Sequence, residues 1–157
     1  VDTPDFFGTW QPAHAGTVTF TTDGIGGANG QSTTVDVPPV GVAYPAKVAE
    51  IADPIVCNGT DIGGFGQTVD LSIANGQPVL PHLTLTLKYA KSAIGWIDPD
   101  EVQFVHQAND GICSFPPRGC NTGNDGFCYD TYWTGSGSCK TLVIRVELPS
   151  NGRGRGF

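Results

Sequence analysis

The chain of 157 residues has no methionine, few positive charges and no long apolar run. It carries 15 acidic against 8 basic side chains, which gives a formal net charge of -7. Nucleic acids and anionic membranes are bound through clustered lysine and arginine, so this balance argues against both as partners. No stretch approaches the roughly 20 consecutive apolar residues that span a bilayer, so we expect no membrane insertion.

Motifs that carry catalysis are also missing. The sequence contains no Gly-x-Ser-x-Gly, no His-Glu-x-x-His and no Gly-Lys pair of a phosphate-binding loop. The three histidines, His14, His82 and His106, lie in different segments. For His82 and His106 a place at a sheet edge or on the surface is favoured over work as a general base. The sequence therefore predicts a protein that is not an enzyme.

The cysteines indicate an oxidising compartment. Four of the five, Cys113, Cys120, Cys128 and Cys139, crowd into a stretch rich in glycine and asparagine that has little apolar patterning. Such a stretch is poorly held without cross-links, and disulfides are typical of exported proteins. Val1-Asp2-Thr3-Pro4 resembles what the removal of a signal peptide leaves. We therefore expect an extracellular or cell-surface protein.

The spacing of these four cysteines favours disulfides over zinc. Six, seven and ten residues separate successive cysteines, whereas zinc ligands usually come in close Cys-x2-4-Cys pairs. Neighbour pairing, Cys113 with Cys120 and Cys128 with Cys139, is the simplest of the three possible pairings because it closes short loops. Cys57 then stands apart as a buried unpaired side chain, a member of a different pairing or an intermolecular link, and burial is favoured.

Period-two alternation is the strongest structural signal in the sequence. Residues 83–89 are apolar at every odd position and polar at every even one, and residues 141–148 repeat the pattern. Weaker copies of the pattern occur at residues 17–22, 33–37, 69–73 and 102–104. Turn signals such as Asn29-Gly30 and Asp110-Gly111 separate these segments.

Many short strands and few helical signals predict an all-β fold. Only residues 46–52 and 89–97 are compatible with a helical turn. We expect one antiparallel β-sandwich at residues 13–149, with a disulfide-pinned loop insertion at residues 111–139. An extended N-terminal segment, residues 1–12, precedes this domain, and a basic C-terminal tail, residues 150–157, follows it.

Part of the chain resembles ZU5-like β-sandwich domains. Residues 34–42, Thr-Val-Asp-Val-Pro-Pro-Val-Gly-Val, resemble a strand of that group that leads into a Pro-Pro-Gly-Ala-type turn, although Val40 here precedes Gly41. Residues 69–89, with two alternating strands around Asn75-Gly76, are similar to the strand, turn and strand that follow there.

The resemblance extends through the acidic loop at residues 98–102 and covers residues 33–110. It implies an Ig-like or ZU5-like sandwich that serves as an interaction or surface module. Val105-His106-Gln107 stands where self-cleaving members carry a His-Phe-Ser type junction. The resemblance therefore implies scaffolding rather than self-cleavage.

Two loops carry candidate ligand or modification residues. Asp98, Asp100 and Glu101 lie close together in the sequence. A solvated turn is favoured for them, and a calcium site is the second interpretation. Asn58-Gly59-Thr60 fits the acceptor pattern for N-glycosylation.

Aromatic side chains gather in the cysteine-rich stretch, at Phe127, Tyr129, Tyr132 and Trp133. A pinned platform of exposed rings would stack on a sugar or contact a partner protein. We favour the alternative that these rings form a small core of the loop, because a loop with few aliphatic side chains must bury something. Trp96 is expected in the core or at an edge.

Charge is distributed unevenly along the chain. Residues 1–139 contain four basic and 14 acidic side chains, a balance of -10, and residues 140–157 contain four basic and one acidic, a balance of +3. An extended end of one copy can join an open sheet edge of the next, and head-to-tail repetition gives a filament. The candidate residues for this assembly are Phe6, Phe7, Trp10, Arg153, Arg155 and Phe157. Docking of both ends on their own domain is an equal rival.

The sequence thus predicts a non-enzymatic, extracellular structural or adhesive β-sandwich that assembles with copies of itself into a filament or pilus-like fibre by strand exchange. The alternative is a carbohydrate-binding module that takes glycans on the aromatic residues of the cysteine-rich loop. No cofactor is expected apart from the calcium interpretation.

Overall fold

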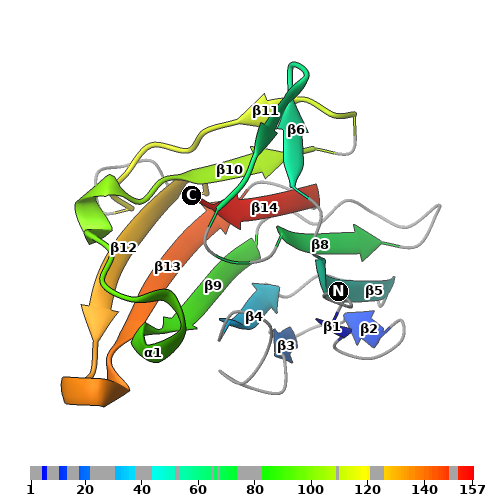
Figure 1. The fold of residues 1–157 in the computed structure, drawn as a ribbon. Coiled ribbons are helices and arrows are strands. Elements are labelled where there is room, and N and C mark those ends of the chain that lie inside the picture. Colours follow the sequence, from blue (N-terminus) through cyan, green and yellow to red (C-terminus); the bar gives the residue numbers. More distant parts are fainter. Residues whose placement is uncertain are drawn as a thin grey trace.

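The computed structural model of the protein shows two antiparallel β-sheets with one core between them (Figure 1). The structure describes residues 5–6, 11–13, 18–21, 31–37, 44–51, 54–64, 66, 68–73, 83–108, 110–120, 126–148 and 152–157. Within these residues nearly all secondary structure is strand, so the predicted all-β sandwich is confirmed. No helix in the described residues is long and apolar enough to cross a membrane.

The first sheet, sheet A, contains seven strands. They are β1 (Asp5–Phe6), β2 (Gln11–Ala13), β5 (Tyr44–Ile51), β8 (Thr68–Ile73), β10 (Phe104–Gln107), β11 (Cys113–Ser114) and β14 (Gly152–Gly156). Their spatial order is β1-β5-β8-β14-β10-β11, and β2 pairs with β5 beside β1. The N-terminal strands therefore form one edge of sheet A, whereas the C-terminal strand lies in its interior.

The second sheet, sheet B, has the order β12-β13-β9-β4-β3. Its strands are β3 (Val18–Thr21), β4 (Gln31–Val37), β9 (Leu83–Ala90), β12 (Cys128–Thr134) and β13 (Thr141–Leu148). Outside the two sheets lie the hairpin of β6 (Ile55–Cys57) and β7 (Thr60–Ile62), the single turn α1 (Lys91–Ile94), and the 3-10 turns η2 (Pro99–Glu101) and η3 (Gly137–Cys139).

The strands with the clearest alternation, β9 and β13, line the core. Their register pairs Leu85 with Val146 and Leu87 with Ile144, and all four side chains are buried. They pack with Phe104 of sheet A in one hydrophobic core. Each such burial contributes about 1.5–3 kcal/mol, which is why one-sided apolar alternation predicts these strands well.

Two segments differ from the expectation. Residues 46–51 form part of strand β5 and not a helical turn, because β5 pairs with β8 along six residues. In the stretch expected to be a loop insertion, β12 pairs with β13 along seven residues and extends sheet B. The single turn α1 does lie within residues 89–97, as the sequence suggested.

The basic C-terminal tail is an interior strand of its own domain. β14 pairs with β8 on one side and with β10 on the other. Phe157 continues the ladder, since its N–H donates to Gln103 O at 2.9 Å and its carbonyl accepts from Gln103 N at 2.8 Å. The tail is thus docked within the chain that carries it.

The alternation of glycine and arginine in β14 has a structural reason. The register places Gly154 and Gly156 on the core face beside His106 and Phe104. A Cβ atom at Gly154 would lie 2.3 Å from Cζ of Phe104, so the Phe104 ring occupies the space that a side chain would need. Period-two alternation is therefore present in the tail, with glycine on the face toward Phe104 and arginine on the opposite face.

The two arginines of β14 have different surroundings. Arg153 forms an ion pair with Asp70 on β8, with Nε 3.3 Å from Oδ2. Arg155 is buried, and its guanidinium donates to Thr68 Oγ1 at 3.5 Å and to Gly64 O at 3.3 Å. Burial lowers the pKa of Arg155, and the proximity of Tyr89 opposes that shift. Arg155 therefore anchors the loop after β7 to β14.

Gly154→Ala tests the packing of β14. The new Cβ would meet the buried Phe104 ring, so we expect a loss of about 1–3 kcal/mol in the free energy of unfolding, measured by urea denaturation. Gly63→Ala is the matched control, because a Cβ there meets nothing within 4 Å. Equal stability of the two variants would contradict the packing described here.

Candidate functional site

The disulfides differ from the neighbour pairing expected from the sequence. Cys57 bonds to Cys113, Cys120 bonds to Cys128, and Cys139 is free and exposed. Both the neighbour pairing and the unpaired Cys57 are therefore wrong. The reason is the fold, because the β6–β7 hairpin lies against β11 and brings together two cysteines that are 56 residues apart.

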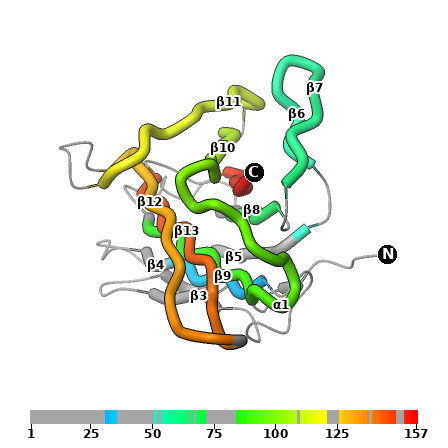
Figure 2. Tube along the Cα trace, turned by 60° about the vertical axis from the view of Figure 1, so that its left-hand side comes forward, coloured from blue at the N-terminus to red at the C-terminus, as the bar shows by residue number. Residues whose placement is uncertain are grey.

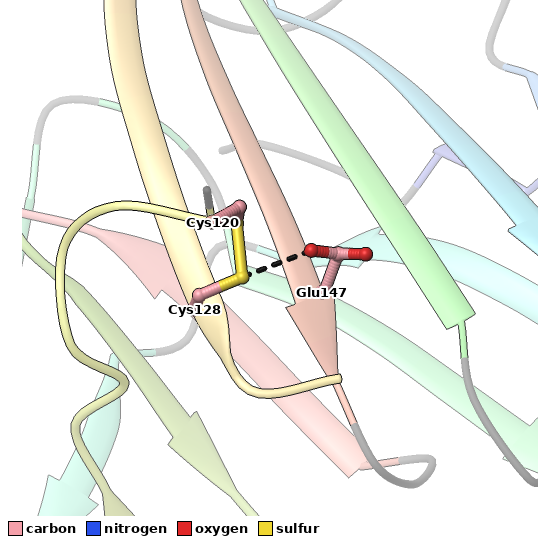
Figure 3. Close-up of side chains that lie close together, drawn as sticks. All are labelled: Cys120, Cys128 and Glu147. Atoms are coloured by element: carbon pink, nitrogen blue, oxygen red, sulfur yellow. Dashed lines mark hydrogen bonds between the residues drawn. A yellow bond between two sulfur atoms is a disulfide. The ribbon is translucent and has the colours of Figure 1, made fainter. Parts of the chain in front are cut away.

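The Cys120–Cys128 disulfide lies beside a carboxylate (Figure 3). Cys128 and Glu147 face each other on β12 and β13, and Oε2 of Glu147 lies 2.9 Å from Sγ of Cys128. Among the described residues, this trio is the one group of three potential metal ligands whose ligand atoms lie within 4.8 Å of one another. Metal binding requires thiolates, and the disulfide leaves none here. The cluster is a cross-link with an adjacent ion pair to Arg145, not an open metal site.

The four aromatic residues of the cysteine-rich stretch do not form one platform. Tyr129 is buried, and Phe127 and Trp133 pack against the core. Tyr132 is 42% exposed and lies on the opposite face of β12 from its neighbour Trp133, because successive side chains of a strand alternate. The predicted small core of the loop itself is therefore wrong, because Tyr129, Phe127 and Trp133 join the core of the whole domain.

An exposed ring that the sequence did not indicate as a binding residue lies beside Trp133. Trp96 is 62% exposed, and its ring stacks on Trp133 with centroids 5.1 Å apart and planes 10° apart. Trp133 is fixed in turn, since its Nε1 donates to Ile97 O at 3.0 Å. Of the two positions expected for Trp96, the core is therefore wrong and the edge fits, because Trp133 belongs to β12, the edge strand of sheet B. No apolar period includes this residue, which follows Gly95 after α1, so alternation could not place it.

Two lysines flank Trp96. The Nζ atoms of Lys91 and Lys140 lie 5.9 and 5.8 Å from the centroid of its ring, within the roughly 6 Å range of a cation–π contact. The backbone N–H of Lys91 donates to Lys140 O at 3.0 Å, which ties α1 to the turn before β13. We call Lys91, Trp96, Trp133 and Lys140 the tryptophan end. It combines an exposed aromatic ring with two positive charges in an acidic protein.

A pocket of about 590 Å³ lies between the β6–β7 hairpin and the β10–β11 hairpin. Its lining includes the Cys57–Cys113 disulfide, Thr60, Asp110, Ile112 and Phe115. We call it the disulfide pocket.

Two apolar side chains of the disulfide pocket are unusually exposed, Ile112 at 64% and Phe115 at 53%. The Phe115 ring meets the Phe157 ring edge to face, with centroids 6.2 Å apart. Gln107 Nε2 donates to Val56 O at 2.8 Å and to Gly111 O at 3.2 Å, so it joins the two hairpins beside the disulfide. The pocket therefore has fixed walls and an apolar rim.

The tryptophan end and the disulfide pocket lie at opposite ends of the molecule. In Figure 1 the β6–β7 hairpin and β11 lie at the top, and α1 lies at the bottom with the turn between β12 and β13. Figure 2, turned by 60°, shows the same separation. The chain thus presents two chemically different surfaces that point away from each other.

Other predicted site residues are not gathered into a site. The side chain of Asp98 accepts a hydrogen bond from Asp100 N at 3.0 Å and caps the turn η2. Asp98, Asp100 and Glu101 form no cluster of the kind described for Cys128, so the structure adds no support for calcium. Asn58 is exposed at the tip of the β6–β7 hairpin, where its φ of 52° and the φ of 78° at Gly59 make the turn.

His106 is buried on β10, which pairs with a strand on each side, so its expected place at a sheet edge or on the surface is wrong. His14 and His82 lie outside the described residues, as do Phe7 and Trp10 among the assembly candidates. Phe6 lies in β1, where its backbone pairs with Ala49. Arg153, Arg155 and Phe157 contact their own domain.

Comparison of the chain with protein-family models, with curated proteins and with solved structures finds no match. The resemblance of residues 33–110 to ZU5-like domains therefore stays a prediction. Function has to be argued from the surfaces of the chain itself.

The observed disulfides predict unequal losses of stability. Cys57 and Cys113 close a loop of 56 residues, and Cys120 and Cys128 close one of 8. Chain-entropy arguments give about 4 kcal/mol for the longer loop and about 2.5 kcal/mol for the shorter one. We expect this order when the two double Cys→Ser variants are unfolded in urea.

Cys139→Ser is the control for these variants, because its thiol is free and exposed, and its stability should match that of the parent. Peptide mapping without reduction checks the pairing itself. A fragment that joins Cys113 to Cys120 would contradict the structure.

Proposed function

We propose that the chain is an extracellular, non-enzymatic structural subunit that assembles with copies of itself by exchanging its N-terminal edge strands. One observation carries this proposal. Among the strands that the structure describes, β1 and β2 form an edge of sheet A and pair only with β5, through five residue pairs between Asp5 and Ala13 on one side and Tyr44 and Glu50 on the other. The same backbone hydrogen bonds form equally well with the β5 strand of a neighbouring copy.

Releasing the N-terminal strands disrupts the fold less than releasing the C-terminal strand. Removing β1 and β2 opens one edge of sheet A and leaves the ladder between β5 and β8 intact. Removing β14 would divide sheet A between β8 and β10. It would also remove the buried side chain of Arg155. The N-terminal strands are therefore the exchanged segment in this proposal, and the C-terminal tail is a fixed part of the domain.

The disulfides support the extracellular location. One joins the β6–β7 hairpin to β11, and the other joins Cys120 to the first residue of the edge strand β12. Disulfides persist in oxidising compartments such as the cell exterior. A surface subunit that must survive outside the cell gains from such cross-links, because they limit the unfolded ensemble.

Deletion of residues 1–13 tests the exchange. We expect the truncated chain to remain folded by circular dichroism, because the buried core that the structure describes lies on other strands, and to form no filaments in negative-stain electron microscopy. A synthetic peptide of residues 1–13 should bind the truncated chain and not the intact one, and a peptide of the same composition in scrambled order should bind neither. Filaments of the truncated chain equal to those of the parent, or a strictly monomeric parent, would contradict the proposal.

A second candidate function is carbohydrate binding. The exposure of Trp96 favours it, since a planar indole held by the ring beneath it is a stacking surface for a sugar. This candidate moves the binding surface from the four rings of the cysteine-rich stretch to the tryptophan end.

A glycan array tests this second candidate. We expect Trp96→Ala to lower the signal of any bound glycan about tenfold or more, the loss of about 1.4 kcal/mol or more. Tyr132→Ala should leave the signal unchanged, because Tyr132 lies on the other face of β12. Binding that is indifferent to Trp96→Ala would rule out this surface.

A further inference from the structure

We infer that the tryptophan end of one copy docks into the disulfide pocket of the next copy. This inference rests on the proposed function, self-assembly, and it identifies a second contact between copies besides strand exchange. Two separate surfaces support it. The tryptophan end offers an exposed ring and two positive charges, and the disulfide pocket offers a cavity with an apolar rim and a carboxylate.

The disulfide pocket has the shape and composition of a docking site. Its volume of about 590 Å³ falls within the roughly 300–1,000 Å³ of pockets that enclose compact organic groups. Ile112 and Phe115 leave more than half of their side-chain surface in water, which is costly unless something covers them. The Cys57–Cys113 disulfide and the hydrogen bonds of Gln107 fix the walls, so little order has to be gained on binding.

The tryptophan end has the matching chemistry. Trp96 is more exposed than Tyr132, at 62% against 42%, and tryptophan is enriched among residues that dominate protein interfaces. Its stacking on Trp133 fixes the ring before contact, which reduces the entropy lost on docking. An indole ring covers apolar surface such as that of Ile112 and Phe115 without leaving a buried charge.

The charges of the two surfaces are opposite. Lys91 and Lys140 flank Trp96, whereas the carboxylate of Asp110 lines the disulfide pocket. Asp110 is held in place, because its Oδ1 accepts a hydrogen bond from Ile112 N at 3.0 Å. When Trp96 enters the pocket, the two ammonium groups come near the carboxylate of Asp110, and such complementarity fixes orientation and speeds association.

The placement of the two surfaces determines the form of the assembly. They lie at opposite ends of the molecule and are unlike each other (Figures 1 and 2). A contact between unlike surfaces is heterologous, and it continues from copy to copy as a chain unless the rotation closes it into a ring. A second copy is therefore a better occupant of the disulfide pocket than an unrelated small molecule, because the chain itself carries the complementary end.

Trp96→Ala tests the docking in the intact chain, with Tyr132→Ala as the matched aromatic control. We expect Trp96→Ala to raise the concentration at which assembly begins by about tenfold or more, as for an interface hot spot. Tyr132→Ala should change it by less than about twofold, since Tyr132 is exposed on the outer face of sheet B away from both surfaces. Sedimentation velocity measures both, and thermal unfolding shows that each variant is folded.

Charge reversal tests the pairing of the two ends. Asp110→Lys alone and the double variant Lys91→Glu with Lys140→Glu should each assemble poorly, because each brings like charges together at every contact. A one-to-one mixture should recover assembly. The pocket of Asp110→Lys then meets the tryptophan end of the double variant with opposite charges. The pocket of the double variant meets the tryptophan end of Asp110→Lys, and both of these surfaces are unchanged from the parent. Asp110→Asn serves as the control for the turn, because its side-chain oxygen can still accept the hydrogen bond from Ile112 N.

The outcomes separate this inference from the proposed function. Loss of assembly in each charge variant with recovery in the mixture supports the docking. Full assembly of Trp96→Ala and of both charge variants overturns the docking and leaves strand exchange standing. A parent chain that stays monomeric overturns both, and a monomer that binds a glycan through Trp96 assigns the tryptophan end to the second candidate function.

Discussion

The insertion of β14 between β8 and β10 is the constraint on which the rest of the structure depends. Without this strand, sheet A separates into a part that carries the N-terminal edge and a part that carries β10 and β11. One wall of the disulfide pocket, the β10–β11 hairpin, belongs to the second part, and the proposed exchange edge belongs to the first. The last residues of the chain therefore set the relation between the two surfaces that the proposals use. Glycine at Gly154 makes the insertion possible, because the Phe104 ring fills the space beside it.

The sequence predicts the strands whose two faces differ most in hydropathy. β9 and β13 alternate apolar and polar residues because one face meets the core and the other meets solvent. Alternation of apolar and polar residues did not predict β14, since its core face consists of glycine, which has no apolar side chain. Alternation did not predict β5 either, because its two alanines and one proline give weak contrast in hydropathy, and its pairing with β8 decides its conformation.

The disulfide pocket and the tryptophan end are both formed by residues that are far apart in the sequence. Local patterns in the sequence therefore could not predict them. The partner of Cys57 is chosen by the packing of two hairpins, so counting the spacing of neighbouring cysteines pointed to the wrong pairs. The separation of Tyr132 from Trp133 was accessible in principle, because alternation along a strand implies it, but the surrounding glycines and cysteines indicated a loop. The ring of Trp96 is held by stacking on Trp133, 37 positions further along the chain.

Assembly through N-terminal exchange is the central claim, and isotope-mixed cross-linking tests it most directly. Isotope-labelled and unlabelled chains are assembled together, and Lys47 on β5 is linked by carbodiimide to the carboxylates of residues 1–13. The account predicts linkages between labelled and unlabelled peptides at about the frequency expected for random partners. Linkages found only within chains of the same label would show that β1 and β2 stay on their own domain, and would contradict the account.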